Sequence, residues 1–75
     1  MTELVRDFGL AVRHFREQQG WSQEALAERA DLNRSYLGEV ERGRAVPSLE
    51  TAAKLASALE IPLSGLLARC ERLAA

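Results

Sequence analysis

The residues best suited to recognition chemistry lie on one short segment, residues 34–42. On a helical wheel with about 100° per residue, one arc of this segment is polar and the opposite arc is mostly apolar. Arg, Ser and Glu side chains can reach base edges or phosphates, and a glycine among them permits close approach to another surface. The arc is either a nucleic-acid-binding surface or a solvated face, and periodicity alone does not decide. Its members are Arg34, Ser35, Gly38, Glu39 and Arg42.

Other kinds of chemistry lack the residues that they need. The sequence has a single cysteine, Cys70, and a single histidine, His14, so an intramolecular disulfide is excluded and a zinc site lacks ligands. There is no Ser/His or Cys/His arrangement and no glycine-rich phosphate loop. We therefore expect no enzyme activity, no cofactor and no small-molecule ligand, and we interpret Cys70 as a packing residue.

The composition is that of one small folded domain, residues 1–75. Hydrophobic residues make up 47% and charged residues 28% of the chain. The net charge of −1 supplies no overall positive field, so any DNA binding depends on locally placed arginines. Each copy of the chain should then bind weakly unless a second copy binds beside it. Glu3 and Asp7 near the start, without a continuous apolar run, fit neither a signal peptide nor a membrane span. We expect a cytoplasmic protein without membrane contact.

Apolar spacing and capping residues predict five helices and no strands, over residues 3–19, 23–30, 34–42, 49–59 and 63–73. Gly20 and Gly43 are placed to end the first and third of these in the left-handed conformation, and Asp31 lies at a tight bend after the second. The predicted N-caps of the second, third and fourth helices are Ser22, Asn33 and Ser48.

Three of the predicted helices carry apolar stripes. The first has Leu4, Val5, Phe8, Val12 and Phe15, and the fourth has Leu49, Ala52, Leu55, Ala56 and Leu59. The apolar arc of the last helix is wider than one neighbouring helix would cover. This width favours a dimer interface over a helix that only caps the core of its own chain. The expected interface residues are Leu63, Leu66, Leu67, Cys70 and Leu73.

A short capped helix, a bend and a second short helix with a free polar side form the helix-turn-helix layout. Residues 22–43, SQEALAERADLNRSYLGEVERG, resemble the Cro/lambda-repressor-type (XRE) helix-turn-helix family, with Gln23 opening the second helix, Ala27 at the helix crossing and Glu-Arg-Gly at the end. Asp31 departs from the pattern, which often has glycine there. A stand-alone chain of this size resembles restriction-modification controller proteins, small phage-type repressors and some antitoxins.

The resemblance implies an all-α, five-helix, lambda-repressor-like domain that binds double-stranded DNA with helix 34–42 in the major groove. It also implies a homodimer whose two recognition helices lie about 34 Å apart on a palindromic operator. The function expected is therefore a sequence-specific transcriptional regulator. The alternatives are an antitoxin or a helical protein-interaction module that uses the same surface.

Roles for single residues follow from the resemblance. Gln23 would contact a phosphate, Arg34 would contact guanine and Glu39 would accept from cytosine N4. Arg42 and Arg44 would contact phosphates, and Tyr36 would either pack in the core or contact a phosphate. The expected DNA-binding residues are Ser22, Gln23, Asn33, Arg34, Ser35, Tyr36, Glu39, Arg42 and Arg44.

One carboxylate is expected to have a structural role. By helical phase Glu41 lies beside Leu37 on the core side, where an unpaired carboxylate is unfavourable, so Glu41 needs a cation. Arg16 lies at the edge of the apolar stripe of the first helix. The resemblance implies that Arg16 and Glu41 form a structural ion pair.

Overall fold

The computed structural model describes the backbone of residues 2–74 and the side chains of residues 3–71. Over these residues the chain forms five α-helices and no strand, which confirms the predicted all-α architecture. Every helix boundary lies within one residue of its predicted position. The helices are α1 (Thr2–Gln18), α2 (Gln23–Ala30), α3 (Arg34–Glu41), α4 (Leu49–Ala58) and α5 (Leu63–Ala74).

The N-termini of α2, α3 and α4 are capped by the predicted side chains. Ser22 Oγ accepts from the backbone N–H of Ala25 at 3.1 Å, and Ser48 Oγ accepts from that of Thr51 at 3.0 Å. The Asn33 side-chain oxygen accepts from the first-turn amides of α3 at 2.8 and 3.2 Å. Each cap satisfies amides that have no partner within the helix, so these short helices begin at defined residues.

Asp31 makes the turn from α2 to α3 in the left-handed conformation, with φ 57° and ψ 49°. Its own N–H donates to the carbonyl of Glu28 at 3.2 Å, and the N–H of Leu32 donates to the carbonyl of Ala27 at 2.8 Å. These two hydrogen bonds close the helix as in a Schellman motif. Asp31 thus occupies a position at which an L side chain is strained and glycine is not.

We expect Asp31→Gly to raise the free energy of unfolding by about 0.5–1 kcal/mol, because relief of the left-handed strain exceeds the extra chain entropy that glycine loses on folding. The Asp31 side chain is exposed, so little contact is lost. Urea denaturation measures the change. Glu28→Gly, an exposed change within right-handed α2, is the control and should lower stability by about 1 kcal/mol. A destabilised Asp31→Gly variant would contradict the strain assignment.

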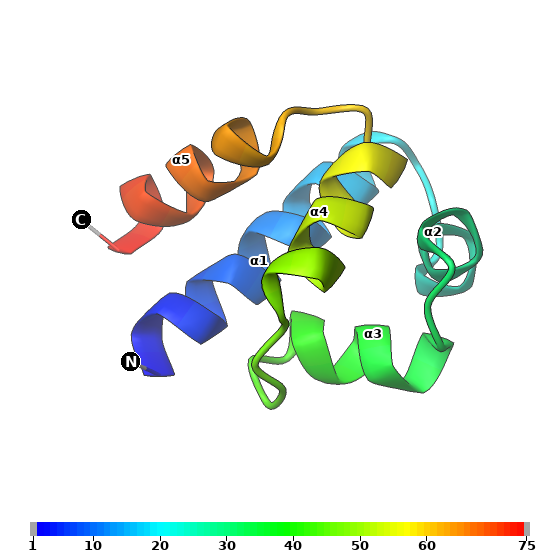
Figure 1. Ribbon diagram of the computed structural model, residues 1–75, viewed down its shortest axis with the longest axis horizontal. Helices are drawn as coiled ribbons and strands as arrows, with labels where there is room; N and C mark the ends of the chain where they lie inside the picture. Colours follow the sequence, from blue (N-terminus) through cyan, green and yellow to red (C-terminus); the bar gives the residue numbers. More distant parts are fainter. Residues whose placement is uncertain (1, 75) are drawn as a thin grey trace.

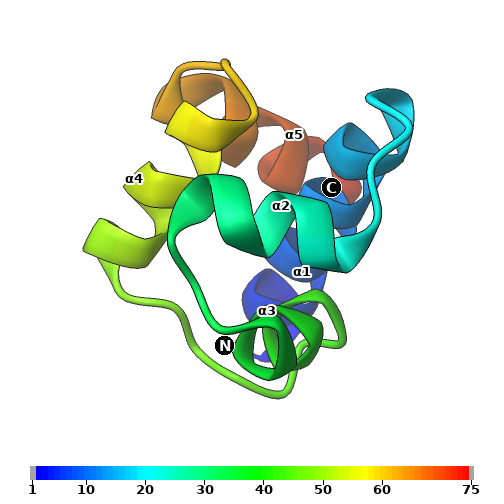
Figure 2. The same ribbon diagram turned by 90° about the vertical axis from the view of Figure 1, so that its right-hand side faces the viewer.

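The helices pack around α1, which contacts α5 on one side and α3 on the other (Figure 1). The second helix contacts α3 and α4, and Figure 2 shows α2 crossing above α3, which is seen end-on. All five helices contribute to one core. Its members are Phe8, Ala11, Val12, Leu26, Ala27, Ala30, Leu37, Val40, Ala52, Leu55, Ala56, Leu59, Leu66 and Cys70.

The crossing of α1 and α3 is a contact between backbones at Gly9. A Cβ atom added at Gly9 would lie 2.3 Å from the carbonyl oxygen of Val40 and 2.7 Å from that of Glu41. No side chain fits in that space, so glycine is required for α3 to lie where it does. No local pattern in the sequence indicates this role for Gly9.

Burial within one chain corrects part of the predicted dimer interface. Leu66 and Cys70 are 0% exposed because α5 packs along α1, so neither side chain presents surface to a partner. Burial raises the pKa of the Cys70 thiol, and the nearby carboxylates of Asp7 and Glu71 raise it further. Cys70 is a packing residue, as expected. Leu63 is half-buried and Leu67 is 38% exposed, whereas Leu73 lies outside the side chains that the structure describes.

The predicted apolar stripe of the fourth helix is buried except at its first residue. Ala52, Leu55, Ala56 and Leu59 are buried, but Leu49 is 79% exposed. As the first residue of α4, Leu49 borders a hollow between α1, α4 and α5 that no described side chain fills. Helical phase placed Leu49 on the correct face of the helix, but that face is uncovered at its first turn.

Candidate nucleic-acid interface

The predicted polar arc lies on the exposed side of α3. Arg34 and Ser35 are exposed, and the side chains of Glu39 and Arg42 are 42% and 50% exposed. The opposite side of the helix carries Leu37 and Val40, each 0% exposed. In Figure 1, α3 lies along the lower edge of the molecule, away from α5. The arc therefore presents polar groups to solvent on a helix that is held by its apolar side.

Gln23, at the first position of α2, extends this polar surface. An open hollow is lined by five of the residues that the sequence analysis assigned to DNA binding, together with a glycine. They are Gln23, Arg34, Ser35, Gly38, Glu39 and Arg42. Helices α2 and α3 thus bring their predicted contact residues to one place.

The other predicted contact residues lie around this hollow in different roles. Ser22 and Asn33 use side-chain oxygens to cap α2 and α3, as described above. Tyr36 is half-buried and packs against the hydrophobic core, which favours the packing alternative for its ring. Arg44 is exposed in the loop after α3.

The ion pair between Arg16 and Glu41 is present and nearly buried, with side-chain exposures of 11% and 2%. Arg16 Nε and Nη2 donate to the two carboxylate oxygens of Glu41 at 2.8 and 3.0 Å, and Nη1 donates to the carbonyl of Trp21 at 2.8 Å. The hydrogen bond that Arg16 donates to Glu41 is the main reason that the pKa of Arg16 is raised. One guanidinium thereby ties α1 to α3 and to the loop before α2.

The same carboxylate also positions Gln23. Gln23 Nε2 donates to Glu41 Oε1 at 2.9 Å, so the amide at the start of α2 is fixed by a residue at the end of α3. Nothing in the local pattern links side chains 18 positions apart, so only the fold reveals this contact.

Arg42 folds back along the polar arc. Its Nη2 atom donates to Glu39 Oε2, and this hydrogen bond is the main reason that the pKa of Glu39 is lowered. A Cβ atom added at Gly38 would lie 3.2 Å from Arg42 Nη2, so the guanidinium lies against the bare backbone of Gly38.

Arg6 is a cation near this surface that the sequence analysis did not select. Its side chain is 63% exposed, and it borders a hollow with Arg42, Gly43 and Glu3. Arg6 belongs to α1 and lies far from α3 in the sequence. The first helix has three arginines and three acidic residues, so its composition gives no signal that distinguishes Arg6 from Arg13.

Two further features bear on the chemistry of the described part of the chain. No helix there combines the length and the apolar character that crossing a bilayer requires. Within those same residues, no group of three or more His, Cys, Asp or Glu side chains is placed to hold a metal ion.

Comparison with solved structures finds proteins that share this fold. The restriction-modification controller protein C.AhdI from Aeromonas hydrophila is 45% identical, with a TM-score of 0.82 over 88% of this chain and 98% of that one. The clp gene regulator ClgR from Corynebacterium glutamicum is 33% identical, with a TM-score of 0.90 over 96% and 94%.

Curated sequences give the same result. Control protein C.BamHI from Bacillus amyloliquefaciens is 39% identical over 89% of this chain and 85% of its own length. The chain spans 36% of the transcriptional regulator SutR from Escherichia coli and 41% of the immunity repressor of Bacillus phage phi105. The helix-turn-helix family model matches residues 12–66, most of the chain. The chain belongs to the helix-turn-helix family of the Cro/lambda-repressor (XRE) type.

Proposed function

We propose that this chain is a sequence-specific transcriptional regulator of the cytoplasm that places α3 in the major groove of double-stranded DNA. The observation that carries the proposal is the polar arc of α3, which lies exposed on a helix whose other side is core. A major groove admits one α-helix, and the exposed side chains are of the types that read base edges and phosphates. The names of the relatives, which include regulators and control proteins, support the same function.

Within this proposal the residues around α3 divide into two groups. Arg34, in the first turn of α3, is the principal base contact, since recognition helices read bases with their N-terminal residues. Gln23 holds a phosphate from the start of α2, in the orientation that Glu41 gives it. Arg44 and Arg6, which both lie beside Gly43 at the C-terminal end of α3, contact phosphates, and this compensates for a net charge of −1.

Arg34→Ala should relax the base preference at one position of each half-site, with about a tenfold loss of affinity for the preferred duplex. The control Arg44→Ala should weaken all duplexes evenly, because phosphate contacts carry no sequence information. Selection from a random duplex pool gives the preference. Fluorescence anisotropy over a series of salt concentrations gives the affinity, which should fall steeply with salt. A wild-type protein that retains no duplex at low salt would exclude DNA binding.

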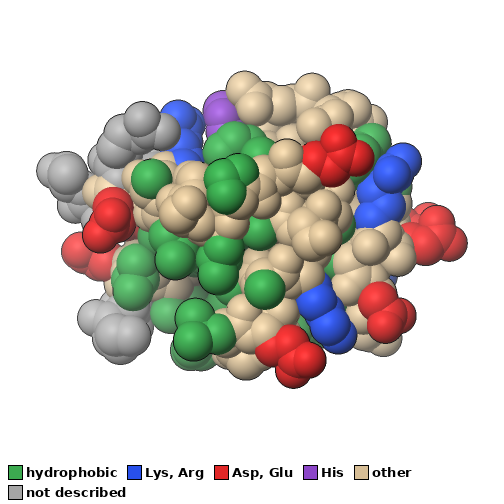
Figure 3. Space-filling view, turned by 45° about the horizontal axis from the view of Figure 1, so that its top comes forward, with side chains coloured by type: hydrophobic (Ala, Val, Ile, Leu, Met, Phe, Trp, Pro, Cys, Tyr) green, Lys and Arg blue, Asp and Glu red, His purple; other side chains and the backbone are tan. Residues whose placement is uncertain are grey.

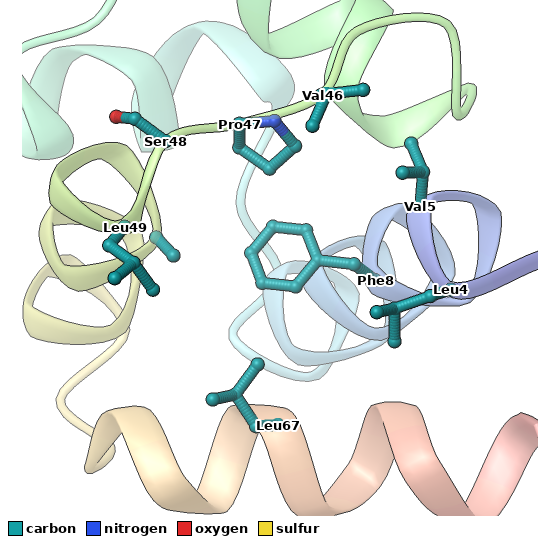
Figure 4. A pocket seen from close by; sticks show the side chains of 9 residues that line it. Leu4, Val5, Phe8, Val46, Pro47, Ser48, Leu49 and Leu67 are labelled. Atoms are coloured by element: carbon teal, nitrogen blue, oxygen red, sulfur yellow. The ribbon is translucent and has the colours of Figure 1, made fainter. Parts of the chain in front are cut away.

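We also propose that the regulator is a homodimer on a palindromic operator. Among the described side chains, four exposed large hydrophobic residues from α1, α4, α5 and the loop before α4 border one apolar hollow, with Phe8 at its centre (Figure 4). Hydrophobic side chains also gather toward the α5 end of the molecule in Figure 3. The four exposed residues are Leu4, Val46, Leu49 and Leu67.

The shape of this surface suits a second copy of the chain. Leu49 and Val46 are 79% and 73% exposed and project beside the hollow, so the patch offers both a protrusion and a recess. A two-fold axis places the protrusion of each copy against the recess of the other. Because the loop between α3 and α4 borders the patch, such a dimer keeps two recognition helices near a common edge, as two half-sites require.

Leu49→Asp should convert the dimer to a monomer, because each copy would bury a charge in the apolar contact. Sedimentation equilibrium gives the mass, and Leu49 is exposed enough for the monomer fold to persist. Leu10→Asp is the matched control: Leu10 is also an exposed leucine, at 41%, but it lies outside the hollow, so its variant should remain dimeric. If Leu49→Asp kept the wild-type mass, the dimer would use a different surface.

A further inference from the structure

The guanidinium of Arg42 lies away from its own end of α3. The Arg42 backbone continues the helix, with φ −86° and ψ 0°, and side chains of helical residues point back over the preceding turn. The guanidinium rests over Gly38 and bonds to Glu39. The positive charge therefore lies about one turn, roughly 5.4 Å, closer to the middle of α3 than the Cα atom of Arg42. Residues spaced by four lie along one strip of a helix, and Arg34, Gly38 and Arg42 are spaced in this way. The guanidinium of Arg42 therefore lies on the same strip of α3 as Arg34.

Gly38 makes this placement possible. Any Cβ atom there would lie 3.2 and 3.3 Å from the two terminal nitrogens of Arg42, which is closer than side chains normally pack. Glycine also weakens the interior of a helix, and α3 has only eight residues. A Cβ atom at position 38 would push the guanidinium off the helix backbone by a few tenths of an ångström, whereas on a merely solvated face it would displace nothing.

Glu39 accepts a hydrogen bond from Arg42 through one carboxylate oxygen, Oε2. Its hydrogen bond to Arg42 holds the pKa of Glu39 below the usual value, so the group is ionised when it faces the groove. An unpaired carboxylate would be repelled by the phosphates of DNA, while the paired one is neutralised by the arginine. The pair leaves most of the five N–H donors of Arg42 free, in the planar fork that matches guanine O6 and N7.

We propose that Arg42 reads a base pair from the middle of α3 and that Glu39 is the positioning residue that holds it there. This inference rests on the proposed function. It assigns to Arg42 a role in specificity in place of the phosphate contact implied by the family resemblance. It likewise assigns to Glu39 an indirect role in place of contact with cytosine.

The test is to select bound duplexes from a random pool at one salt concentration, with wild type, Arg42→Ala and Glu39→Ala. Both variants should lose about tenfold of preference at the same base pair and keep the preference elsewhere. Combining the two changes should add little, because both act through one contact. The matched control Arg44→Ala removes the same charge from the nearby loop, and it should lower affinity for all duplexes without changing the selected sequence.

Gly38→Ala gives a readout that is independent of any lost charge. The added methyl group displaces only the end of a flexible side chain, and alanine favours the helix, so the variant should melt at or above the wild-type temperature. It should nevertheless lose preference at the base pair that Arg42→Ala affects. If Gly38 had only a structural role, Gly38→Ala would keep the preference at that base pair wherever the variant melts at or above the wild-type temperature.

Two results would overturn the proposal. In the first, Arg42→Ala weakens binding to all duplexes evenly, which would show that Arg42 contacts phosphate alone. In the second, Glu39→Ala raises affinity and leaves the selected sequence unchanged, which would show that this change only removes a negative charge. Failure of the wild-type protein to retain any duplex is a distinct result, because it removes the proposed function itself and this inference with it.

Discussion

Replacing Gly9 with alanine should lower the free energy of unfolding by about 3 kcal/mol, which is close to the whole stability of a domain of this size. The added Cβ atom would lie 2.3 Å from one backbone oxygen of α3 and 2.7 Å from the next. Backbone atoms cannot turn aside as side chains do, so α1 and α3 must separate. The variant should be largely unfolded at room temperature or should melt far below the wild type.

Gly65→Ala is the matched control, since it makes the same change inside another helix. A Cβ atom at Gly65 would meet Pro62 Cγ at 3.4 Å, which is an ordinary contact, and alanine favours the helix by up to about 1 kcal/mol. The same substitution should thus stabilise one helix and disrupt the packing of another. Urea denaturation followed by far-UV circular dichroism compares the two. Equal stability of Gly9→Ala and wild type would show that α1 and α3 do not touch at this point.

Gly9 also bears on the proposed function, because it sets the distance between α3 and the rest of the molecule. Val40 and Glu41, whose carbonyls meet Gly9, belong to the last turn of α3. A displaced α3 would disturb the Glu41 carboxylate that orients Gln23. Any folded fraction of Gly9→Ala should therefore bind DNA less well than wild type.

The helices themselves were predictable because their signals are local. Ser22 and Asn33 cap helices through hydrogen bonds to amides two or three positions away, and Asp31 bends the chain through its own dihedral angles. Such features are complete within a few residues of sequence. The exposed arc of α3 is equally local, since helical phase alone separates Glu39 from Leu37.

Contacts between distant residues were not predictable in the same way. Helical phase says which face of α4 or α5 carries apolar residues, but not how far along that face a neighbour extends. Leu49 was therefore placed on the apolar stripe of α4 but is exposed, while Leu66 was expected at an interface and is buried. The contact of Gly9 with α3 and that of Gln23 with Glu41 have no local signal at all.

Glu41 is an intermediate case, since its phase showed that it needs a cation and the family resemblance pointed to Arg16. We expect Glu41→Gln to lower the free energy of unfolding by about 3 kcal/mol, because it leaves the guanidinium of Arg16, 11% exposed, without its counter-charge. The control is Glu17→Gln, which breaks an exposed pair with Arg13 whose members are 54% and 58% exposed. That change should lower stability by no more than about 0.5 kcal/mol. Equal urea midpoints for Glu41→Gln and wild type would contradict the burial of the pair.

A double variant separates stability from DNA binding. Replacing both members with apolar residues, as in Arg16→Met with Glu41→Leu, removes the buried charges together and should restore much of the stability that Glu41→Gln loses. It cannot restore the acceptor for Gln23, whose amide bonds to Glu41 at 2.9 Å. The double variant should therefore melt closer to wild type than Glu41→Gln and still bind its operator more weakly. Wild-type affinity in a stable double variant would show that Glu41 supports the fold without positioning Gln23 for DNA.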